Sequence, residues 1–367
     1  MEKKINKVVI SGGGTGGHIF PAIAIANEIK NKYPDADILF VGANGKMEMQ
    51  KVPQAGYKII GLPITGFQRR LAVSNFILPF KLVYSLLKAF LLLRRFKPNV
   101  VIGVGGYASG PILRVASFMS LPTMIQEQNS FPGKTNRILS KVVDKICVAY
   151  DGLEKFFPKG KIVFTGNPIR NEMVSIEGKK DEAFSFFGLD HNKKTILVIG
   201  GSLGARTLNQ SIINSLNLIS ENNIQVLWQC GNFYFSNYKS DVEIYKSKGV
   251  FLNEFIYKMD LAYACADVII SRAGAISVSE LSLVGKPVIL VPSPNVSDDH
   301  QTKNALALVN KSAALLIKDN EAQNVLINEA ISLLNNQDKS IQLASNCLKL
   351  GVPNAAERIV KEIENII

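Results

Sequence analysis

Four glycine-rich segments contain the residues whose types and spacing could do chemistry in this chain. The first is GGGTGGH at 12–18, the second GVGGYASGP at 103–111, the third GGSLGAR at 200–206 and the fourth SRAGAISVSE at 271–280. Glycine lets backbone N–H groups approach a phosphate or a sugar hydroxyl without a Cβ in the way. A helix that starts after such a turn adds about half a positive charge at its N-terminus. The segments therefore predict a phosphorylated ligand.

Two ionisable side chains adjoin these segments. His18, one of three histidines, either hydrogen-bonds nearby backbone or acts as a general base. The second role is open to it because an unperturbed imidazole has a pKa of about 6.5, and a positive helix end favours its neutral form. Glu280 either completes an S-x-x-E capping box with Ser277 or accepts hydrogen bonds from ribose hydroxyls. Both alternatives stay open for each side chain.

Two other kinds of site are not favoured. Residues 12–17 fit the dinucleotide fingerprint GxGxxG, but Ala43 and Asn44 stand where a dehydrogenase needs an acid after the second strand. Asp298 and Asp299 are adjacent acids, yet no DxD or histidine spacing accompanies them, so we expect no metal. Helix dipoles and glycine amides can stabilise a departing diphosphate instead.

The elements that position these segments follow from alternating patterns. Short β-branched runs such as KVVI, DILFVG and KTILVIGG alternate with helical patterns, which is typical of parallel sheets with crossover helices. The 367 residues suffice for two domains of ~150 to 200 residues. We predict an α/β protein with two Rossmann-like, doubly wound domains, 1–168 and 169–345, facing a shared cleft. A C-terminal helix within 346–367 is expected to pack back on the first domain.

Positive charge is concentrated in about one fifth of the chain. No Asp or Glu occurs from Met49 through Gln126, whereas this stretch holds ten basic residues: Lys51, Lys58, Arg69, Arg70, Lys81, Lys88, Arg94, Arg95, Lys97 and Arg114. Such a local field attracts phosphates or anionic lipid. The four cysteines show no CxxC spacing and are expected to be reduced core residues. The N-terminus runs directly into a strand, so we expect no export signal.

The most apolar window, residues 76–96, lies inside this basic region. Lys81 and Lys88 interrupt it, so we do not expect it to span a membrane. Helical geometry places both lysines with Ser85 and Arg95 on one stripe. Either this helix covers a sheet with a solvated lysine stripe, or it enters the headgroup layer of an anionic membrane together with residues 67–76. The membrane-contacting residues would be Phe67, Arg69, Arg70, Phe76, Phe80, Lys81 and Lys88.

Taken together and in order, these motifs resemble the MurG family. The matching stretches are GGGTGGHIFPAIAIA, GVGGYASGP, EQNSFPGKTNR, TGNPIR, GGSLGARTLN, SRAGAISVSEL and DDHQTKNA. The resemblance implies a GT-B fold and inverting transfer of GlcNAc from UDP-GlcNAc to the C4 hydroxyl of MurNAc in lipid I, giving lipid II for peptidoglycan. It implies no cofactor and no metal. It also implies a peripheral position at the cytoplasmic face of the bacterial inner membrane. The partners that it implies are an anionic membrane surface and proteins of cell-wall synthesis.

The resemblance also assigns residues by matching motif. Donor contacts would come from Thr15, Gly16, Gly17, Asn129, Arg170, Ser202, Ile256, Ala275, Ile276, Ser277, Val278, Ser279, Glu280 and Gln301. Within this set Glu280 would hold the ribose, Ile256 the uracil, and the helix start at 274–277 the diphosphate. The acceptor side would use His18, Gly105, Gly106, Tyr107 and Glu127, with either His18 or Glu127 as the base. Leu203 and His300 depart from the family pattern, where glutamine is common.

Two rival functions remain to be weighed. A UDP-GlcNAc 2-epimerase acting on a soluble substrate would share the fold class, but it leaves the basic apolar region unexplained. A nonenzymatic lipid or nucleic-acid binder is suggested by the isoelectric point of 9.4. Such a binder needs aromatic residues interleaved with the basic ones, and it leaves the glycine segments without a role. We therefore expect no nucleic-acid partner.

Overall fold

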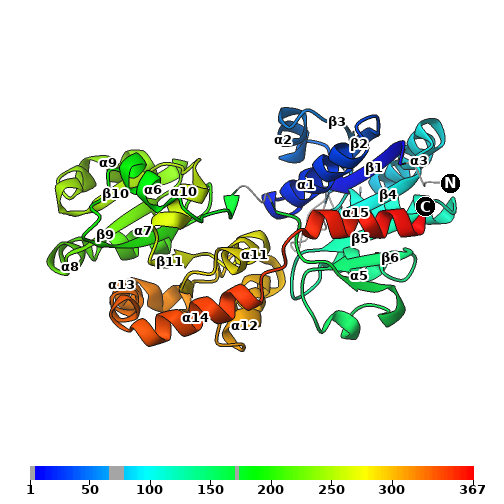
Figure 1. Ribbon diagram of the computed structural model, residues 1–367. Helices are drawn as coiled ribbons and strands as arrows, with labels where there is room; N and C mark the ends of the chain where they lie inside the picture. The colour runs from blue at the N-terminus through cyan, green and yellow to red at the C-terminus, as the bar shows by residue number, and fades with distance from the viewer. Residues whose placement is uncertain (1–4, 66–77, 170–172) are drawn as a thin grey trace. The chain divides into compact units, whose positions relative to one another are not determined.

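The chain forms two compact units in a computed structural model that describes residues 5–65, 78–169 and 173–367. Unit 1 comprises Met1–Ile169 and Asn354–Ile367, and unit 2 comprises Arg170–Pro353. Each unit is built around one parallel sheet with helices on both faces (Figure 1).

Unit 1 contains a seven-stranded sheet of order β3-β2-β1-β4-β5-β6-β7, in which all neighbouring strands are parallel. The strands are β1 Lys7–Gly12, β2 Asp37–Ala43, β3 Lys58–Leu62, β4 Val100–Gly105, β5 Thr123–Glu127, β6 Lys145–Val148 and β7 Ile162–Phe164. The helices are α1 Gly16–Lys32, α2 Glu48–Gln54, α3 Leu78–Phe96, α4 Ser109–Phe118, α5 Lys134–Leu139 and α15 Ala355–Ile366.

Unit 2 repeats this plan with a six-stranded parallel sheet of order β10-β9-β8-β11-β12-β13. The strands are β8 Lys194–Ile199, β9 Ile224–Gln229, β10 Val250–Asn253, β11 Val268–Ser271, β12 Val288–Leu290 and β13 Leu315–Leu316. The helices are α6 Lys180–Phe187, α7 Arg206–Ile213, α8 Leu216–Glu221, α9 Asn232–Glu243, α10 Met259–Cys265, α11 Ala275–Val284, α12 His300–Val309, α13 Asp319–Asn335 and α14 Gln337–Lys349.

Both strand orders reverse direction at one point, between β1 and β4 in unit 1 and between β8 and β11 in unit 2. Ligands of open α/β sheets bind beyond the carboxyl ends of the strands at such a switch point. The four glycine segments lie at the carboxyl ends of these four strands. The prediction of two doubly wound domains is therefore confirmed.

Alternating side chains explain why the sheet of unit 1 carries helices on both faces. In β1 the side chains of Val8 and Ile10 join the core beneath α1, whereas Val9 joins the core beneath α4. Successive residues of a strand point to opposite faces, so a run of apolar residues is buried on both sides. The four cysteines are buried and unpaired, as expected.

The last helix, α15, belongs to unit 1 and lies beside α1 (Figure 1). Its buried residues Ala355, Ile359, Val360 and Ile363 repeat at helical spacing, and the last three join the core beneath α1. At its end the Tyr33 hydroxyl donates to Glu364 Oε1 over 2.8 Å. The end of the chain therefore completes the core of the N-terminal unit.

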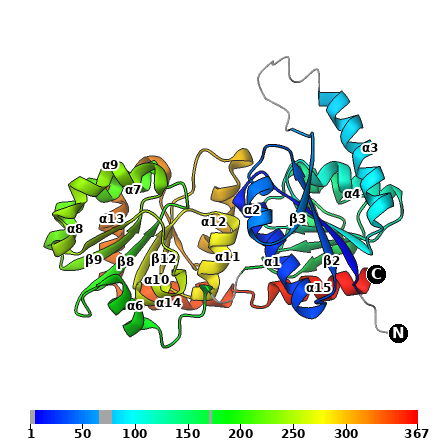
Figure 2. The same ribbon diagram turned by 90° about the horizontal axis from the view of Figure 1, so that it is seen from above.

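Helix α3 lies beside α4 (Figure 2) and packs on it along one narrow face. Apolar side chains are exposed elsewhere on this helix. Ser85, Ala89 and Leu93 are buried, while Lys88 Nζ donates to the Gly61 carbonyl over 2.8 Å. The exposed large side chains are Phe80, Leu82, Val83, Tyr84, Leu87 and Leu91. The predicted stripe is therefore only partly solvated, because Ser85 is buried and Lys88 turns inward, whereas Arg95 is exposed. None of the helices among the described residues is long and apolar enough to cross a bilayer.

We expect Ile363→Ala to lower the free energy of unfolding by about 2–5 kcal/mol, because it leaves a cavity in a closed core. Urea unfolding followed by circular dichroism measures the change. Glu357→Ala, an exposed substitution on the same helix, is the control and should change stability by less than about 0.5 kcal/mol. Equal effects of the two substitutions would contradict the packing of α15.

Candidate functional site

The first and second glycine segments touch through their backbones at the switch point of unit 1. The Gly13 N–H donates to the Gly105 carbonyl over 3.2 Å. Gly106 has φ +90°, and a Cβ on it would lie 2.5 Å from the Gly13 carbonyl oxygen. Only glycine fits at Gly106, since the backbone of the neighbouring segment occupies the side-chain position. The two loops therefore form one surface at the ends of β1 and β4.

His18 lies in the first turn of α1 with its ring turned toward this surface. Its Nδ1 is 2.9 Å from the Gly13 carbonyl oxygen. A carbonyl can only accept, so this contact places the ring proton on Nδ1 and leaves Nε2 as the basic nitrogen. A Cβ on Gly105 would lie 2.7 Å from Nε2, so the glycine makes room for the ring. The two alternatives for His18 are therefore compatible, because Nδ1 bonds the backbone while Nε2 has the lone pair that a general base needs.

Glu48 holds the first glycine segment from behind. This side chain is 1% exposed, and its two oxygens accept from the Gly14 N–H over 2.8 Å and the Ala43 N–H over 3.0 Å. The carboxylate thus occupies a loop amide that a dinucleotide pyrophosphate would need. The sequence predicts no role for Glu48, because the dinucleotide fingerprint needs its acid at 43–44 and Glu48 comes four residues after Asn44. Its position argues further against a dehydrogenase.

Glu127 ends β5 and organises the loop that follows. The carboxylate is 1% exposed and accepts four hydrogen bonds from neighbouring residues. Oε1 accepts from the backbone N–H and the side-chain amide of Asn129 over 3.0 and 3.2 Å. Oε2 accepts from the Gly133 N–H over 3.2 Å and from Asn136 Nδ2 over 2.8 Å. These donors hold the loop before α5 in one conformation.

In unit 2 the fourth glycine segment starts α11, with Gly274 as its N-cap. Ser277 therefore lies inside the first turn, and the alternative that it forms a capping box with Glu280 is wrong. The Tyr263 hydroxyl donates to Glu280 Oε2 over 3.4 Å. Burial, followed by the nearby Glu280 charge, raises the pKa of Tyr263 well above its ordinary value, so this hydroxyl stays a donor.

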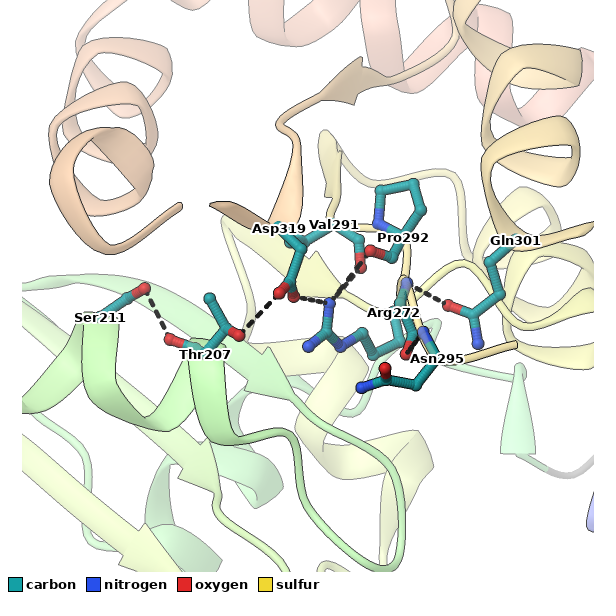
Figure 3. Close-up of polar contacts among 9 residues, drawn as sticks. Thr207, Ser211, Arg272, Val291, Pro292, Asn295, Gln301 and Asp319 are labelled. Carbon is teal, nitrogen blue, oxygen red and sulfur yellow. Dashed lines mark hydrogen bonds and ion pairs between the residues drawn. The ribbon is translucent and has the colours of Figure 1, made fainter. Parts of the chain in front are cut away.

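An ion pair behind the loops of unit 2 links four elements (Figure 3). Arg272 follows β11, and its Nη1 donates to the carbonyls of Val291 and Pro292 over 3.0 and 3.2 Å and to Asp319 Oδ1 over 2.5 Å. Asp319 Oδ2 accepts from Thr207 Oγ1 over 2.8 Å at the start of α7. The guanidinium therefore points away from the helix start that follows it and fixes the surrounding loops.

Gln301 and Gln229 connect further loops of unit 2. Gln301 Oε1 accepts from the Ser293 N–H over 2.8 Å, which ties α12 to the loop after β12 (Figure 3). Gln229 Oε1 accepts from the Ile256 N–H over 2.9 Å, and Gln229 Nε2 donates to the Gly201 carbonyl over 3.1 Å. We predicted no role for Gln229, although a polar residue that ends an apolar strand run was a usable signal.

Most of the predicted site residues lie at the carboxyl ends of the strands within their own unit. In unit 1 these are Thr15, Gly16, Gly17, His18, Gly105, Gly106, Tyr107, Glu127 and Asn129. In unit 2 they are Ser202, Ile256, Ala275, Ile276, Ser277, Val278, Ser279, Glu280 and Gln301. Arg170, Phe67, Arg69, Arg70 and Phe76 lie outside the described residues. Among the residues that are described, no three His, Cys, Asp or Glu side chains gather in a way that could hold a metal ion.

Two family models match the chain, one in each unit. The glycosyltransferase family 28 N-terminal domain matches residues 8–148, and the glycosyltransferase family 28 C-terminal domain matches residues 195–359. A protein of Flavobacterium psychrophilum is 54% identical over 361 residues, with 98% of both chains covered. The chain belongs to glycosyltransferase family 28. This relative is named UDP-N-acetylglucosamine--N-acetylmuramyl-(pentapeptide) pyrophosphoryl-undecaprenol N-acetylglucosamine transferase.

A second relative and two solved structures are also similar to this chain. A protein of the same name from Cytophaga hutchinsonii is 53% identical and covers 100% of this chain and 98% of its own. The crystal structure of Acinetobacter baumannii MurG matches with a TM-score of 0.78 and 27% identity, over 98% of this chain and 99% of that one. UDP-GlcNAc 2-epimerase from Neisseria meningitidis matches with a TM-score of 0.66 and 17% identity over 98% and 100%, which shows a shared fold alone.

We expect Gly106→Ala to lower stability by more than the ~1–2 kcal/mol that a left-handed residue costs, since its Cβ also meets the Gly13 backbone. Thermal unfolding should show a Tm several degrees below that of the wild type. Gly160→Ala, at an exposed position with nothing within 4 Å of the added Cβ and no left-handed φ, is the control and should keep a Tm close to that of the wild type. An unchanged Tm for Gly106→Ala would contradict the close approach of the two segments.

Proposed function

We propose that this enzyme transfers GlcNAc from UDP-GlcNAc to the C4 hydroxyl of MurNAc in undecaprenyl-pyrophosphoryl-MurNAc-pentapeptide, which converts lipid I into lipid II. Identity of 54% over nearly the full length of a relative with that printed name carries the proposal. A basic nitrogen on His18 and a glycine-capped helix start at α11 supply the two groups that such a transfer needs.

Unit 2 binds the donor in this proposal. The diphosphate lies at the N-terminus of α11, which Gly274 caps and where the helix dipole favours an anion. Glu280 accepts from the ribose hydroxyls, the backbone of Ile256 contacts uracil, and Ser202 and Gln301 contact the remaining donor groups. Thr15, Gly16, Gly17, Asn129 and Arg170 are the further donor contacts that the family resemblance implies.

His18 is the general base, and Glu127 is a positioning residue. His18 Nε2 accepts the proton of the C4 hydroxyl, the oxygen attacks the anomeric carbon, and the bond from that carbon to the diphosphate breaks. This single displacement inverts the configuration and releases UDP, whose charge the α11 N-terminus stabilises. Glu127 is unsuited to the first step, because four N–H donors already occupy its two oxygens. Gly105, Gly106 and Tyr107 contact the acceptor.

The exposed face of α3 contacts the membrane that holds the lipid-linked acceptor. Six large apolar side chains are exposed on this helix, and an exposed contiguous apolar patch marks an interaction surface. Exposed Arg94 and Arg95 at its end suit an anionic surface. The enzyme then binds peripherally at the cytoplasmic face of the inner membrane. Lys88 serves this role only indirectly, since its ammonium group fixes α3 to Gly61.

We expect His18→Ala to lower kcat by about 10²- to 10⁴-fold, the usual contribution of general base catalysis, with unchanged affinity for UDP. Transfer of labelled GlcNAc to a short-chain lipid I analogue measures kcat, and calorimetry measures UDP binding. His191→Ala, a half-exposed histidine of unit 2, is the control and should keep full activity. The assay contains EDTA, and loss of wild-type turnover in EDTA would contradict stabilisation of UDP by α11 alone.

Glu127→Gln separates the two candidate bases. An amide nitrogen cannot accept the hydrogen bonds that one carboxylate oxygen now accepts, so we expect a lower Tm and lower activity. The fall of activity at acid pH should persist in Glu127→Gln, because it arises from protonation of His18. If Glu127→Gln lost the fall of activity at acid pH and His18→Ala kept it, the roles of the two residues would be reversed.

We expect the double variant Leu87→Gln, Leu91→Gln to bind vesicles containing phosphatidylglycerol at least about tenfold more weakly, because two exposed leucines no longer enter the lipid. Sedimentation with the vesicles measures binding. Ile341→Gln, Leu348→Gln is the matched control, since both residues are similarly exposed on α14 of unit 2. Equal binding of the two double variants would exclude α3 as the membrane contact.

A further inference from the structure

Gln229 links two loops that the proposed donor site uses for different parts of the nucleotide. It is the last residue of β9 and is 3% exposed. Its carboxamide oxygen accepts from the Ile256 N–H over 2.9 Å, and its carboxamide nitrogen donates to the Gly201 carbonyl over 3.1 Å. One buried side chain thus joins the loop after β10 to the third glycine segment.

The hydrogen bond to Ile256 fixes the orientation of one peptide group. With its N–H bonded to Gln229, the carbonyl of this residue is the group left for a ligand, and no donor among the described residues bonds it. A carbonyl at this position accepts from the N3–H of uracil. Cytosine presents a lone pair at N3 instead, and two acceptors that face each other repel. A fixed Ile256 peptide therefore distinguishes uracil from cytosine.

The hydrogen bond to Gly201 sets where this peptide stands relative to the phosphate side of the site. The rest of the third glycine segment is already held, because Gly204 packs on the backbone of residues 230–231 so closely that a Cβ would lie 2.0 Å from the Cys230 carbonyl oxygen. The Gly201 carbonyl, on a residue with φ +85°, accepts from the Gly204 N–H over 3.0 Å within the segment and from Gln229, which connects it to the loop after β10. Loss of Gln229 frees the Ile256 N–H and removes one of the two donors to the Gly201 carbonyl, so the loop after β10 is no longer tied to the third glycine segment.

We infer that Gln229 is a positioning residue that sets the selectivity for uracil among nucleoside diphosphates, by fixing the Ile256 backbone and tying it to the Gly201 loop. This inference rests on the proposed function, which places uracil at Ile256. Gln229 itself does not touch the base. Its effect appears in the ratio of affinities for two nucleotides that differ only at the pyrimidine edge.

The test compares the dissociation constants of UDP and CDP by calorimetry for the whole chain. Wild type should prefer UDP, and Gln229→Met should reduce this preference by about 5- to 10-fold, the value of one hydrogen bond that positions a group. Methionine has a similar length but makes neither hydrogen bond. The ratio of two affinities does not depend on the fraction of folded protein, so a purely structural role would leave it unchanged.

Gln225 provides a matched control on the same strand. It is 1% exposed, its oxygen accepts from the Asp190 N–H over 2.9 Å, and its nitrogen donates to the Asp190 carbonyl over 2.9 Å. It lies at the opposite end of β9, away from the glycine segments. Gln225→Met should therefore lower the Tm and keep the wild-type preference for UDP over CDP.

Gln229→Glu tests the two hydrogen bonds separately. Glutamate keeps an acceptor for the Ile256 N–H but loses the donor to Gly201, so we expect weaker binding of both nucleotides with the UDP preference retained. An unchanged preference in Gln229→Met, or a lost preference in Gln229→Glu, would overturn the inference, as would a wild type that binds UDP and CDP equally. A wild type that binds no UDP would instead overturn the proposed function.

Discussion

A loop that offers its own N–H groups to a ligand cannot use the same groups to hold itself in place. In this chain buried polar side chains supply the missing attachments from behind the loops. Glu48 accepts from the first glycine segment, Glu127 from the loop after β5, and Gln229 and Arg272 join the loops of unit 2. Binding groups held in advance lose less freedom when a ligand arrives.

The same topology carries different polar groups around its switch point in the two units. In unit 1 the Gly14 amide is already bonded to Glu48, so the first glycine segment lacks one of the groups that would bind a phosphate. In unit 2 the helix that follows the fourth glycine segment starts from Gly274. A repeated strand order thus specifies where a ligand can bind, whereas individual side chains decide which chemistry occurs there.

Much of the fold was predictable because it depends on local patterns. Alternating β-branched runs and glycine turns indicated both doubly wound sheets, and the positions of the glycine segments at strand ends followed from that. The attachments behind the loops were not predictable, since Glu48 and Gln229 bond residues 34 and 28 positions away. For α3 the helix was predictable, but the face that it buries was not, since that face depends on Ser85 and Ala89, whose small side chains let it pack against unit 1.

The return of α15 to unit 1 has a consequence for how the chain is made. Domains generally fold in order as a polypeptide leaves the ribosome, N-terminal parts first. Here the core beneath α1 lacks Ile359, Val360 and Ile363 until the final residues have been synthesised. The core of the N-terminal unit therefore stays incomplete while the whole of unit 2 is translated. Emergence of α15 is then the event that allows the first unit to reach its full stability.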